Sequence, residues 1–488
     1  MNLKLRLILE PMINNMKAVK FIHFSIIFVT FMLISITLNG QIQPIKKNIL
    51  FLMVDDLRPE LSIYGQNIIS PNIDKLAKTG VTFNNAYCNV PVCGASRASI
   101  LTGIRPTNNR FLRYNASISK EAPDVLNLVK HLKNEGYITI SNNKITHLKK
   151  DISDWDEEWY PASKGWRNYI SKENIDLETN GEHGYPYEFP DVEDEAYFDG
   201  QTAAKSIADL KKLKEQNQPF FLAVGFVKPH LPFNAPKRYW DLYDATKIDL
   251  PKNSFFPKEA PKAAQHNWGE LRYYKGIPKK GAVSDDVAKK LIHGYYAGVS
   301  FIDAQIGKVI KALNELNLRD DTIIVLVGDH GWSLSEHGLW AKHSNFKVAL
   351  QVPLVISTSD ISGNQHTESI TELIDLYPTL CDLANIEKPQ HLDGKSLVKI
   401  LNTPNKKYDY SAWARYQKGE TLIIGDYVYT EWQQNGEQFA NMLYDHSIDK
   451  QEIKNVAKNK QYESTVTHLS TILNQRIKAY YDNESKKN

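Results

Sequence analysis

The chain has 488 residues, 42% hydrophobic and 24% charged, a composition typical of a globular protein whose length calls for one large domain and a smaller companion. Its net charge of +3 is small and no basic tract or nucleic-acid motif accompanies it, so nucleic acid is excluded as an expected partner. Three cysteines are too few for a disulfide framework.

The first forty residues resemble an export signal. Lys17 and Lys20 precede an apolar run over residues 21–38, and a small residue follows where a signal peptidase would cut. Met16 is an alternative start. We therefore expect a signal peptide over residues 1–40, a periplasmic or secreted protein and no stable membrane insertion. A retained anchor is the alternative, because the run is close to the length that spans a bilayer.

The first element expected in the folded part is a buried strand over residues 48–54. Its apolar run is typical of a parallel strand covered by helices on both faces. Asp55 and Asp56 follow at the carboxyl end, where open α/β sheets place their ligands. Adjacent carboxylates repel each other unless a cation compensates them, so the pair is a candidate metal site, with a solvated turn as the alternative.

Residues 91–103, Pro-Val-Cys-Gly-Ala-Ser-Arg-Ala-Ser-Ile-Leu-Thr-Gly, place a cysteine at an expected helix start. Arg97 lies about one turn after Cys93 and can return towards it at the amino end of the helix, where anions are favoured. By itself, Cys93 is equally compatible with ordinary packing or with a disulfide to Cys88. If Cys93 is functional, Cys88 and Cys381 are expected to be buried thiols.

Two further groups of polar residues follow predicted strands. A helix over residues 123–135 and a strand over residues 137–141 precede Lys144 and His147, whose spacing alone is typical of a solvated surface. A third buried strand begins near Pro219 and runs into the turn Lys228-Pro229-His230. His230 is a candidate site residue, and Lys228 is expected to be structural or to face solvent.

Residues 322–328 predict another apolar strand, which ends in Asp329 and His330. Two strand ends that carry carboxylates favour one oxygen-rich site for a hard divalent ion, calcium before magnesium, because calcium accepts many carboxylate ligands in irregular geometry. Zinc is an alternative, since Asp and His also bind it. Lys342 lies in the polar loop that follows.

The remaining segments carry weaker signals. Residues 151–199 are rich in acidic and aromatic residues and predict either a pocket wall or a surface insertion, and the lysine-containing segment 252–280 could guide an anionic chain. A helix over residues 295–313 is expected to be scaffold. The composition turns polar near Asn402, and alternating strands and a closing helix over residues 464–480 predict a small carboxyl-terminal domain.

Together and in this order, these motifs resemble type I, formylglycine-dependent sulfatases. The family pattern Cys-x-(Pro or Ala)-Ser-Arg falls on Cys93 to Arg97, and residues 329–346 resemble the iduronate-2-sulfatase branch. Ala95 replaces the proline of many members, which leaves open which maturase acts. The resemblance runs from about residue 46 to the end and implies an α/β, alkaline-phosphatase-like sandwich with a large mixed, mostly parallel sheet between helices, in a catalytic domain over 46–402, plus a small antiparallel sheet with a helix over 403–488.

The resemblance also implies the chemistry. A maturase converts Cys93 to formylglycine, whose hydrate offers one hydroxyl to attack sulfur and another to expel sulfate. One Ca²⁺ is implied on Asp55, Asp56, the modified Cys93, Asp329 and His330. The implied catalytic residues are Cys93, Arg97, Lys144, His147, His230 and Lys342. Among them, His147 would take a proton, His230 would bind a sulfate oxygen or protonate the leaving alcohol, and Lys342 would bind sulfate.

The expected function is hydrolysis of sulfate esters on sugars of a polysaccharide or oligosaccharide. Both a glycosaminoglycan uronate 2-O-sulfate and an algal polymer such as ulvan fit the resemblance. The alternatives are a phosphate-ester hydrolase of the same fold with unmodified Cys93, and an inactive protein that binds sulfated glycans. The nearly complete set of polar residues argues against the inactive protein, because unpaired buried charges are unfavourable without a task.

Overall fold

The computed structural model describes residues 12, 16, 46–162 and 166–487. The expected signal peptide falls on residues that, apart from 12 and 16, lie outside this description. Among the described residues, no helix is both long and apolar enough to cross a bilayer. Residues 47–488 form one compact unit, which contains every element discussed below.

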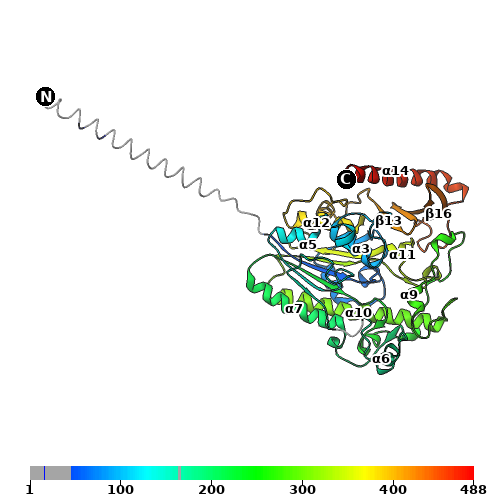
Figure 1. Ribbon diagram of the computed structural model, residues 1–488, viewed down its shortest axis with the longest axis horizontal. Coiled ribbons are helices and arrows are strands. Elements are labelled where there is room, and N and C mark those ends of the chain that lie inside the picture. Colours follow the sequence, from blue (N-terminus) through cyan, green and yellow to red (C-terminus); the bar gives the residue numbers. More distant parts are fainter. Residues whose placement is uncertain (1–11, 13–15, 17–45, 163–165, 488) are drawn as a thin grey trace. The chain divides into compact units, whose positions relative to one another are not determined.

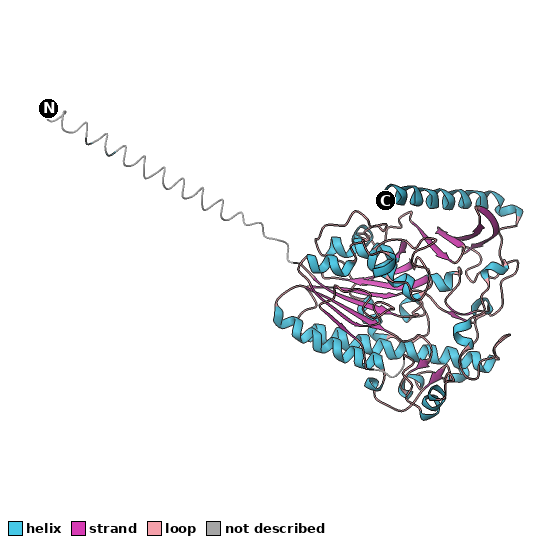
Figure 2. Ribbon diagram, in the orientation of Figure 1, coloured by secondary structure: helices cyan, strands magenta, loops and turns pink. Residues whose placement is uncertain are grey.

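A mixed sheet lies at the centre of this unit and confirms the expected strands (Figure 2). In the described part of the chain its eight strands lie in the order β12 (Gln365–Glu372), β2 (Val81–Tyr87), β11 (Gln351–Ser357), β8 (Thr322–Gly328), β1 (Asn48–Val54), β6 (Phe220–Phe226), β3 (Ile138–Asn143) and β4 (Glu157–Trp159). Only β11 runs antiparallel to its neighbours in this sheet, so the described strands are mostly parallel.

Helices cover both faces of the sheet, as the wholly apolar strands require. One face carries α2 (Pro71–Ala77), α7 (Phe198–Gln216) and α10 (Asp285–Glu315), and the other carries α3 (Cys93–Thr102), α5 (Leu128–Asn134), α12 (Leu376–Leu383) and α13 (Val398–Asn402) (Figure 1). Alternate residues of β1 enter the two cores: Leu50 and Leu52 pack on the α7 and α10 side, and Ile49 and Phe51 on the α3 side. The scaffold helix expected over residues 295–313 is part of α10.

The prediction of a helix over residues 123–135 is wrong at its amino end. Residues 123–127 precede the helix, and α5 begins at Leu128 because Asn127 caps it, accepting a hydrogen bond from the Lys130 backbone N–H. The strand expected over residues 137–141 is observed slightly later along the chain, as β3.

A second, smaller sheet follows α13 and confirms the expected antiparallel strands and closing helix. Its strands are β13 (Ser411–Tyr416), β14 (Gly419–Ile424), β15 (Tyr427–Gln434) and β16 (Glu437–Asp445), and α14 (Glu463–Lys487) packs against it. The other described elements are short: α4 (Ile118–Glu121), α6 (Lys172–Thr179), α8 (Lys237–Trp240), α9 (Gly269–Arg272), α11 (Lys347–Leu350), β5 (Tyr187–Glu188), β7 (Phe233–Asn234), β9 (Ser333–Leu334) and β10 (Trp340–Ala341).

Glu372, at the end of β12, ties the two sheets together. Its buried carboxylate accepts hydrogen bonds from Arg105, from Arg476 of α14 and from the Trp413 backbone N–H of β13. Burial by itself would raise the pKa of Glu372, but the two arginines hold it at about 2. The carboxylate therefore stabilises the folded state above its unfolded pKa near 4.5, and this stabilisation is lost as the pH falls towards 2.

Replacing Glu372 by Gln is expected to lower the free energy of unfolding at pH 7 by about 3 kcal/mol, because Arg105 and Arg476 then keep buried charges without a carboxylate. Urea unfolding followed by circular dichroism measures the change. Glu368→Gln, which alters an exposed carboxylate on the same strand, is the matched control and is expected to change stability by less than about 0.5 kcal/mol. Equal stabilities of the two variants would contradict this role for Glu372.

Candidate active site

The register of four parallel strands brings the predicted polar residues together. Val54 of β1 pairs with Phe226 of β6 and with Gly328 of β8, and β3 ends level with β6. Because these strands end at one edge of the sheet, the residues that follow them lie side by side. Those residues are Asp55 and Asp56 after β1, Lys144 after β3, Lys228 and His230 after β6, and Asp329 and His330 after β8.

Cys93 is the first residue of α3, whose amino end faces this edge. The helix is fixed to the end of β8 because the Ser96 hydroxyl donates to the backbone carbonyl of Asp329 at 2.5 Å. Gly94 permits close contact with the loop that follows the helix, since a Cβ there would lie 1.9 Å from the Tyr114 carbonyl oxygen. These contacts explain why small residues surround the cysteine.

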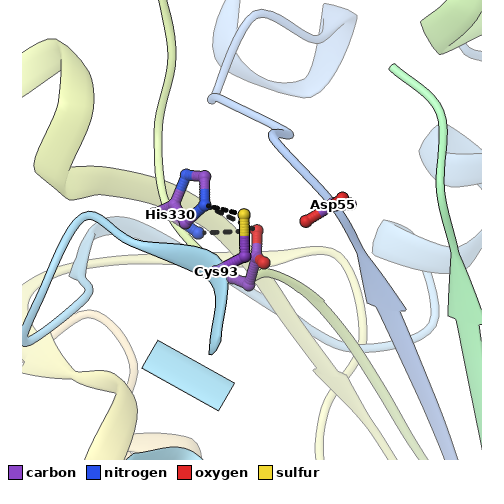
Figure 3. A group of neighbouring side chains, drawn as sticks. Asp55, Cys93 and His330 are labelled. Atoms are coloured by element: carbon purple, nitrogen blue, oxygen red, sulfur yellow. Dashed lines mark hydrogen bonds and ion pairs between the residues drawn. The ribbon is translucent and has the colours of Figure 1, made fainter. Parts of the chain in front are cut away.

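The ligands expected for a metal ion form one buried cluster. Ligand atoms of Asp55, Cys93, Asp329 and His330 all lie within 4.8 Å of one another, and a second overlapping group comprises Asp55, Asp56, Cys93 and His230. The His330 Nε2 atom lies 3.2 Å from the Cys93 sulfur and 3.5 Å from Asp56 Oδ1. Figure 3 shows the imidazole of His330 directed at the sulfur, with Asp55 facing both.

The chemistry of this cluster fits a divalent cation. Asp56 is fully buried beside Asp55, and burial raises its pKa well above the usual value even though Lys342 acts in the opposite direction. A buried carboxylate that resists ionisation marks a place where positive charge is lacking. Its backbone is also left-handed, with φ +58°, a strain that is characteristic of functional sites. Oxygen donors with one imidazole suit calcium, and zinc is chemically possible.

The guanidinium of Arg97 is occupied by the carboxylates of Asp55 and Asp329. Its Nε atom donates to Asp329 Oδ2 at 2.8 Å, its Nη2 atom donates to Asp55 Oδ1 at 3.1 Å, and a third donor binds the Lys144 carbonyl. The Lys144 ammonium also pairs with Asp55. Burial alone would raise the pKa of Asp55, but Lys144 and Arg97 lower it well below the usual value. The structure thus places Arg97 where it fixes the orientation of two candidate ligands.

The Cys93 thiol is poorly suited to act as a nucleophile without modification. Burial and the nearby Asp55 carboxylate raise its pKa to about 12, against the opposing effects of Lys342 and Lys144. The thiolate is the nucleophilic form of cysteine. Because the pKa is raised, very little thiolate exists at neutral pH. Cys88 and Cys381 are buried free thiols, as expected, and neither forms a disulfide with Cys93.

Lys342 and His230 form the second side of the site. The Lys342 ammonium is 3.2 Å from Asp56 Oδ1 and 3.2 Å from His230 Nε2, and it lies over the ring of Trp332. The Nδ1 atom of His230 lies 2.6 Å from the Leu231 carbonyl, which leaves Nε2 directed at the site. Burial, together with Lys342, lowers the pKa of His230 to about 4.

His147 lies beside Lys144 at the edge of the site. Burial and the neighbouring Lys144 charge lower its pKa to about 3, so the imidazole is neutral at physiological pH. Its Nδ1 atom has no hydrogen-bond partner among the described residues. The ring meets the exposed Tyr114 edge to face, with centroids 5.6 Å apart.

Lys228 has the structural role that was one of its two expected roles. It does not face solvent: its ammonium is buried and donates to the backbone carbonyls of His230 and Pro232, so it shapes the turn that presents His230. Among the aromatic residues of segment 151–199, Trp166 is half exposed and meets the His230 ring at 5.5 Å, whereas Trp155 stacks on Phe221 in the core. Trp166 thus supports the pocket-wall expectation, and Trp155 is structural.

Sequence reasoning missed Glu270. This residue of α9 has one carboxylate oxygen 3.0 Å from His230 Nε2 and the other 3.0 Å from the Lys342 ammonium. Although burial acts in the opposite direction, Lys342 and His230 lower its pKa well below the usual value. Glu270 lies in the lysine-containing segment 252–280, where no motif indicates an acidic site residue. Only the fold brings it next to His230 and Lys342.

Comparisons with known proteins find matches along most of the chain. The sequence model of the Sulfatase family matches residues 47–386, and the one described as "N-sulphoglucosamine sulphohydrolase, C-terminal" matches residues 335–479. Iduronate 2-sulfatase of Mus musculus is 34% identical over 382 residues, which cover 70% of this chain and 69% of that protein.

Two solved structures share the fold. BT4656 in complex with its substrate D-glucosamine-2-N,6-O-disulfate aligns with a TM-score of 0.73 and 22% identity over 90% of this chain and 99% of that chain. The phosphonate monoester hydrolase SpPMH of Silicibacter pomeroyi aligns with a TM-score of 0.74 and 23% identity over 89% and 96%. The same architecture therefore occurs in a protein with a disulfated glucosamine substrate and in a phosphonate monoester hydrolase, and the fold alone does not select the substrate.

Proposed function

Because this chain belongs to the sulfatase family and is a sulfuric ester hydrolase that acts on sulfated sugars, we propose that its nucleophile is a formylglycine formed from Cys93. The observation that carries the proposal is the position of Cys93 at the start of a helix. The carboxylates of Asp55, Asp56 and Asp329 lie on one side of the site, and Lys342 and His230 lie on the other. The high pKa of its thiol supports the need for modification. A formylglycine-generating maturase is the implied partner.

The proposed cofactor is one calcium ion. Asp55, Asp56, Asp329 and His330 would hold it together with an oxygen of the modified Cys93. The ion would stabilise negative charge on the nucleophile and the sulfate oxygens. The hydrate of formylglycine would supply one hydroxyl to attack sulfur and a second whose deprotonation releases sulfate.

The remaining side chains are assigned roles from their contacts. Lys342 Nζ binds sulfate oxygens and offsets the charge that gathers on them as the ester bond breaks. For Nε2 of His230 to bind a sulfate oxygen or to protonate the departing alcohol, the imidazole must be protonated in the substrate complex, because its Nδ1 atom already donates to the Leu231 carbonyl. His147, neutral at physiological pH, accepts a proton from the nucleophile, and Lys144 binds one of its oxygens. Arg97 holds Asp55 and Asp329 in position.

The proposed substrate is a sulfated polysaccharide or oligosaccharide, either a glycosaminoglycan uronate with a 2-O-sulfate or an algal polymer such as ulvan. The name of the mouse relative supports the uronate. The exposed Trp166 and Tyr114 supply aromatic surfaces at the site, which suit sugar faces. We propose a periplasmic or secreted location together with this substrate, because sulfated polysaccharides are encountered outside the cytoplasm.

Mass spectrometry of the peptide that contains Cys93 tests the proposal. In protein made together with a maturase, this residue is expected to have exchanged its sulfur for an aldehyde oxygen, and the same protein is expected to release sulfate from a panel of defined sulfated oligosaccharides. The sulfate that disappears identifies the position attacked. A residue that keeps its sulfur, together with no sulfate release, would contradict the proposed nucleophile.

A phosphate-ester hydrolase is the second candidate, because SpPMH shares the fold. A phosphate-ester hydrolase with unmodified Cys93 would keep its activity in Cys93→Ser, so this substitution separates the two functions. An inactive glycan-binding protein would bind sulfated sugars and release no sulfate in the same panel.

A further inference from the structure

Glu270 introduces a negative charge among the groups that are proposed to bind sulfate. Its two carboxylate oxygens contact His230 Nε2 and Lys342 Nζ, each at 3.0 Å. A sulfate ester is an anion, so a carboxylate at this position opposes the binding of a second negative group and already offsets part of the positive charge of Lys342. Its presence in such a site therefore needs an explanation beyond general anion binding.

The fold holds Glu270 firmly in this place. On either side, Trp268 and Leu271 are buried, 7% and 1% exposed. The Arg272 guanidinium lies 3.4 Å over the Trp268 ring and donates to backbone carbonyls at both ends of the segment, those of Asn267, Pro278 and Gly281. Since both neighbours are anchored in the core, the carboxylate is a fixed feature of the site.

Glu270 also lies on the solvent side of the cations. The side chains of Asp56 and Lys342 are 0% and 4% exposed, whereas that of Glu270 is 21% exposed. A substrate whose sulfate reaches Lys342 must therefore place the neighbouring part of its sugar against this carboxylate. A carboxylate accepts hydrogen bonds from hydroxyl groups and repels anions.

We propose that Glu270 is a specificity-determining residue that selects sugars with a free hydroxyl beside the scissile sulfate and rejects sugars with a second anionic group there. This inference rests on the proposed function and adds to it the class of substrate, a sugar that carries one sulfate and has a free hydroxyl at the position bound next to Glu270.

Steady-state kinetics of Glu270→Gln test the proposal. Two substrates are compared, a sugar with one sulfate and a vicinal hydroxyl, and the same sugar sulfated at both positions. Glu270→Gln is expected to raise kcat/KM for the disulfated sugar relative to the monosulfated one by about tenfold, mainly through KM, because removing one charge close to a second anion relieves its repulsion. Glu270→Asp keeps the charge and is expected to keep the selectivity.

Glu182→Gln is the matched control, because it removes an exposed carboxylate that pairs with Lys275 on the outer side of the same segment. It is expected to leave the selectivity unchanged. If Glu270→Gln lowers kcat/KM for both sugars by the same factor, the residue only positions Lys342 and the inference is overturned. Thermal melting establishes that each variant is folded.

Calorimetric binding of inorganic sulfate separates failure of this inference from failure of the proposed function. Affinity for sulfate is expected to rise by about tenfold in Glu270→Gln, whether or not the protein hydrolyses either sugar. If the parent protein releases no sulfate from any substrate but this gain is observed, the proposed function fails while the charge role of Glu270 stands. If sulfate affinity is unchanged, Glu270 does not compete with anions and the inference fails.

Discussion

Replacing Cys93 by Ala is expected to lower kcat for sulfate release by about 10⁴-fold or more, because without the thiol the side chain cannot be converted to the aldehyde. Cys93→Ser keeps one hydroxyl but lacks the second, whose deprotonation expels sulfate. We therefore expect it to release no more than one equivalent of alcohol per enzyme and to retain covalently bound sulfate. Ion chromatography of free sulfate and intact-protein mass spectrometry measure the two outcomes.

Cys88→Ala is the control, because Cys88 is also a buried free thiol but its side chain contacts the Ala349 carbonyl rather than the site. It is expected to keep kcat within about twofold and to alter stability modestly. Full multiple turnover of Cys93→Ser on aryl phosphates, with no sulfate release by the parent protein, would instead favour the phosphate-ester hydrolase.

Asp56→Asn is expected to lower kcat by about 10³-fold and to lack the rise in melting temperature that we expect calcium to produce in the parent protein. The amide keeps the shape of the side chain but not the charge that a hard cation requires. Activity assays, calcium titrations followed by thermal melting, and elemental analysis of the purified protein measure these effects. Asp382→Asn, which changes a partly exposed carboxylate paired with Lys388, serves as the control and is expected to preserve the calcium response.

The direction of the stability change without metal follows from the raised pKa of Asp56. A carboxyl group whose folded pKa lies above its unfolded value of 3.8 binds its proton more tightly in the folded state, so its ionisation opposes folding as the pH rises from 3.8 through the folded pKa. At neutral pH without calcium, Asp56→Asn is therefore expected to be at least as stable as the parent protein. Marked destabilisation under these conditions, or stabilisation of the parent by zinc and not by calcium, would contradict the calcium site.

Much of the fold could be predicted because its signals are local. The apolar runs before Asp55 and Asp329 identify strands buried on both faces, and helix-covered parallel strands end at one edge of the sheet. Polar residues placed directly after such strands are therefore neighbours even when they lie far apart in the sequence. The helix start at Leu128 was not predicted: the expected helix began at residue 123, whereas Asn127 caps the observed one.

The environment of each side chain could not be predicted in the same way. Lys228 is buried because its ammonium binds two carbonyls of a turn, and Arg97 is occupied by Asp55 and Asp329. These contacts depend on the path of the backbone through three dimensions. The sequence around a lysine or arginine does not indicate whether its side chain will donate hydrogen bonds to water or to protein oxygens.

Residues adjacent along the chain were enough to predict the strand ends, the candidate ligands and the position that we propose for the nucleophile. Only the tertiary structure decided that Glu270 meets His230 and Lys342, since residues from three separate segments converge there. Periodicity and motif spacing report on neighbours in sequence, whereas the electrostatic energy of a site depends on distances in space, which the packing of segments sets.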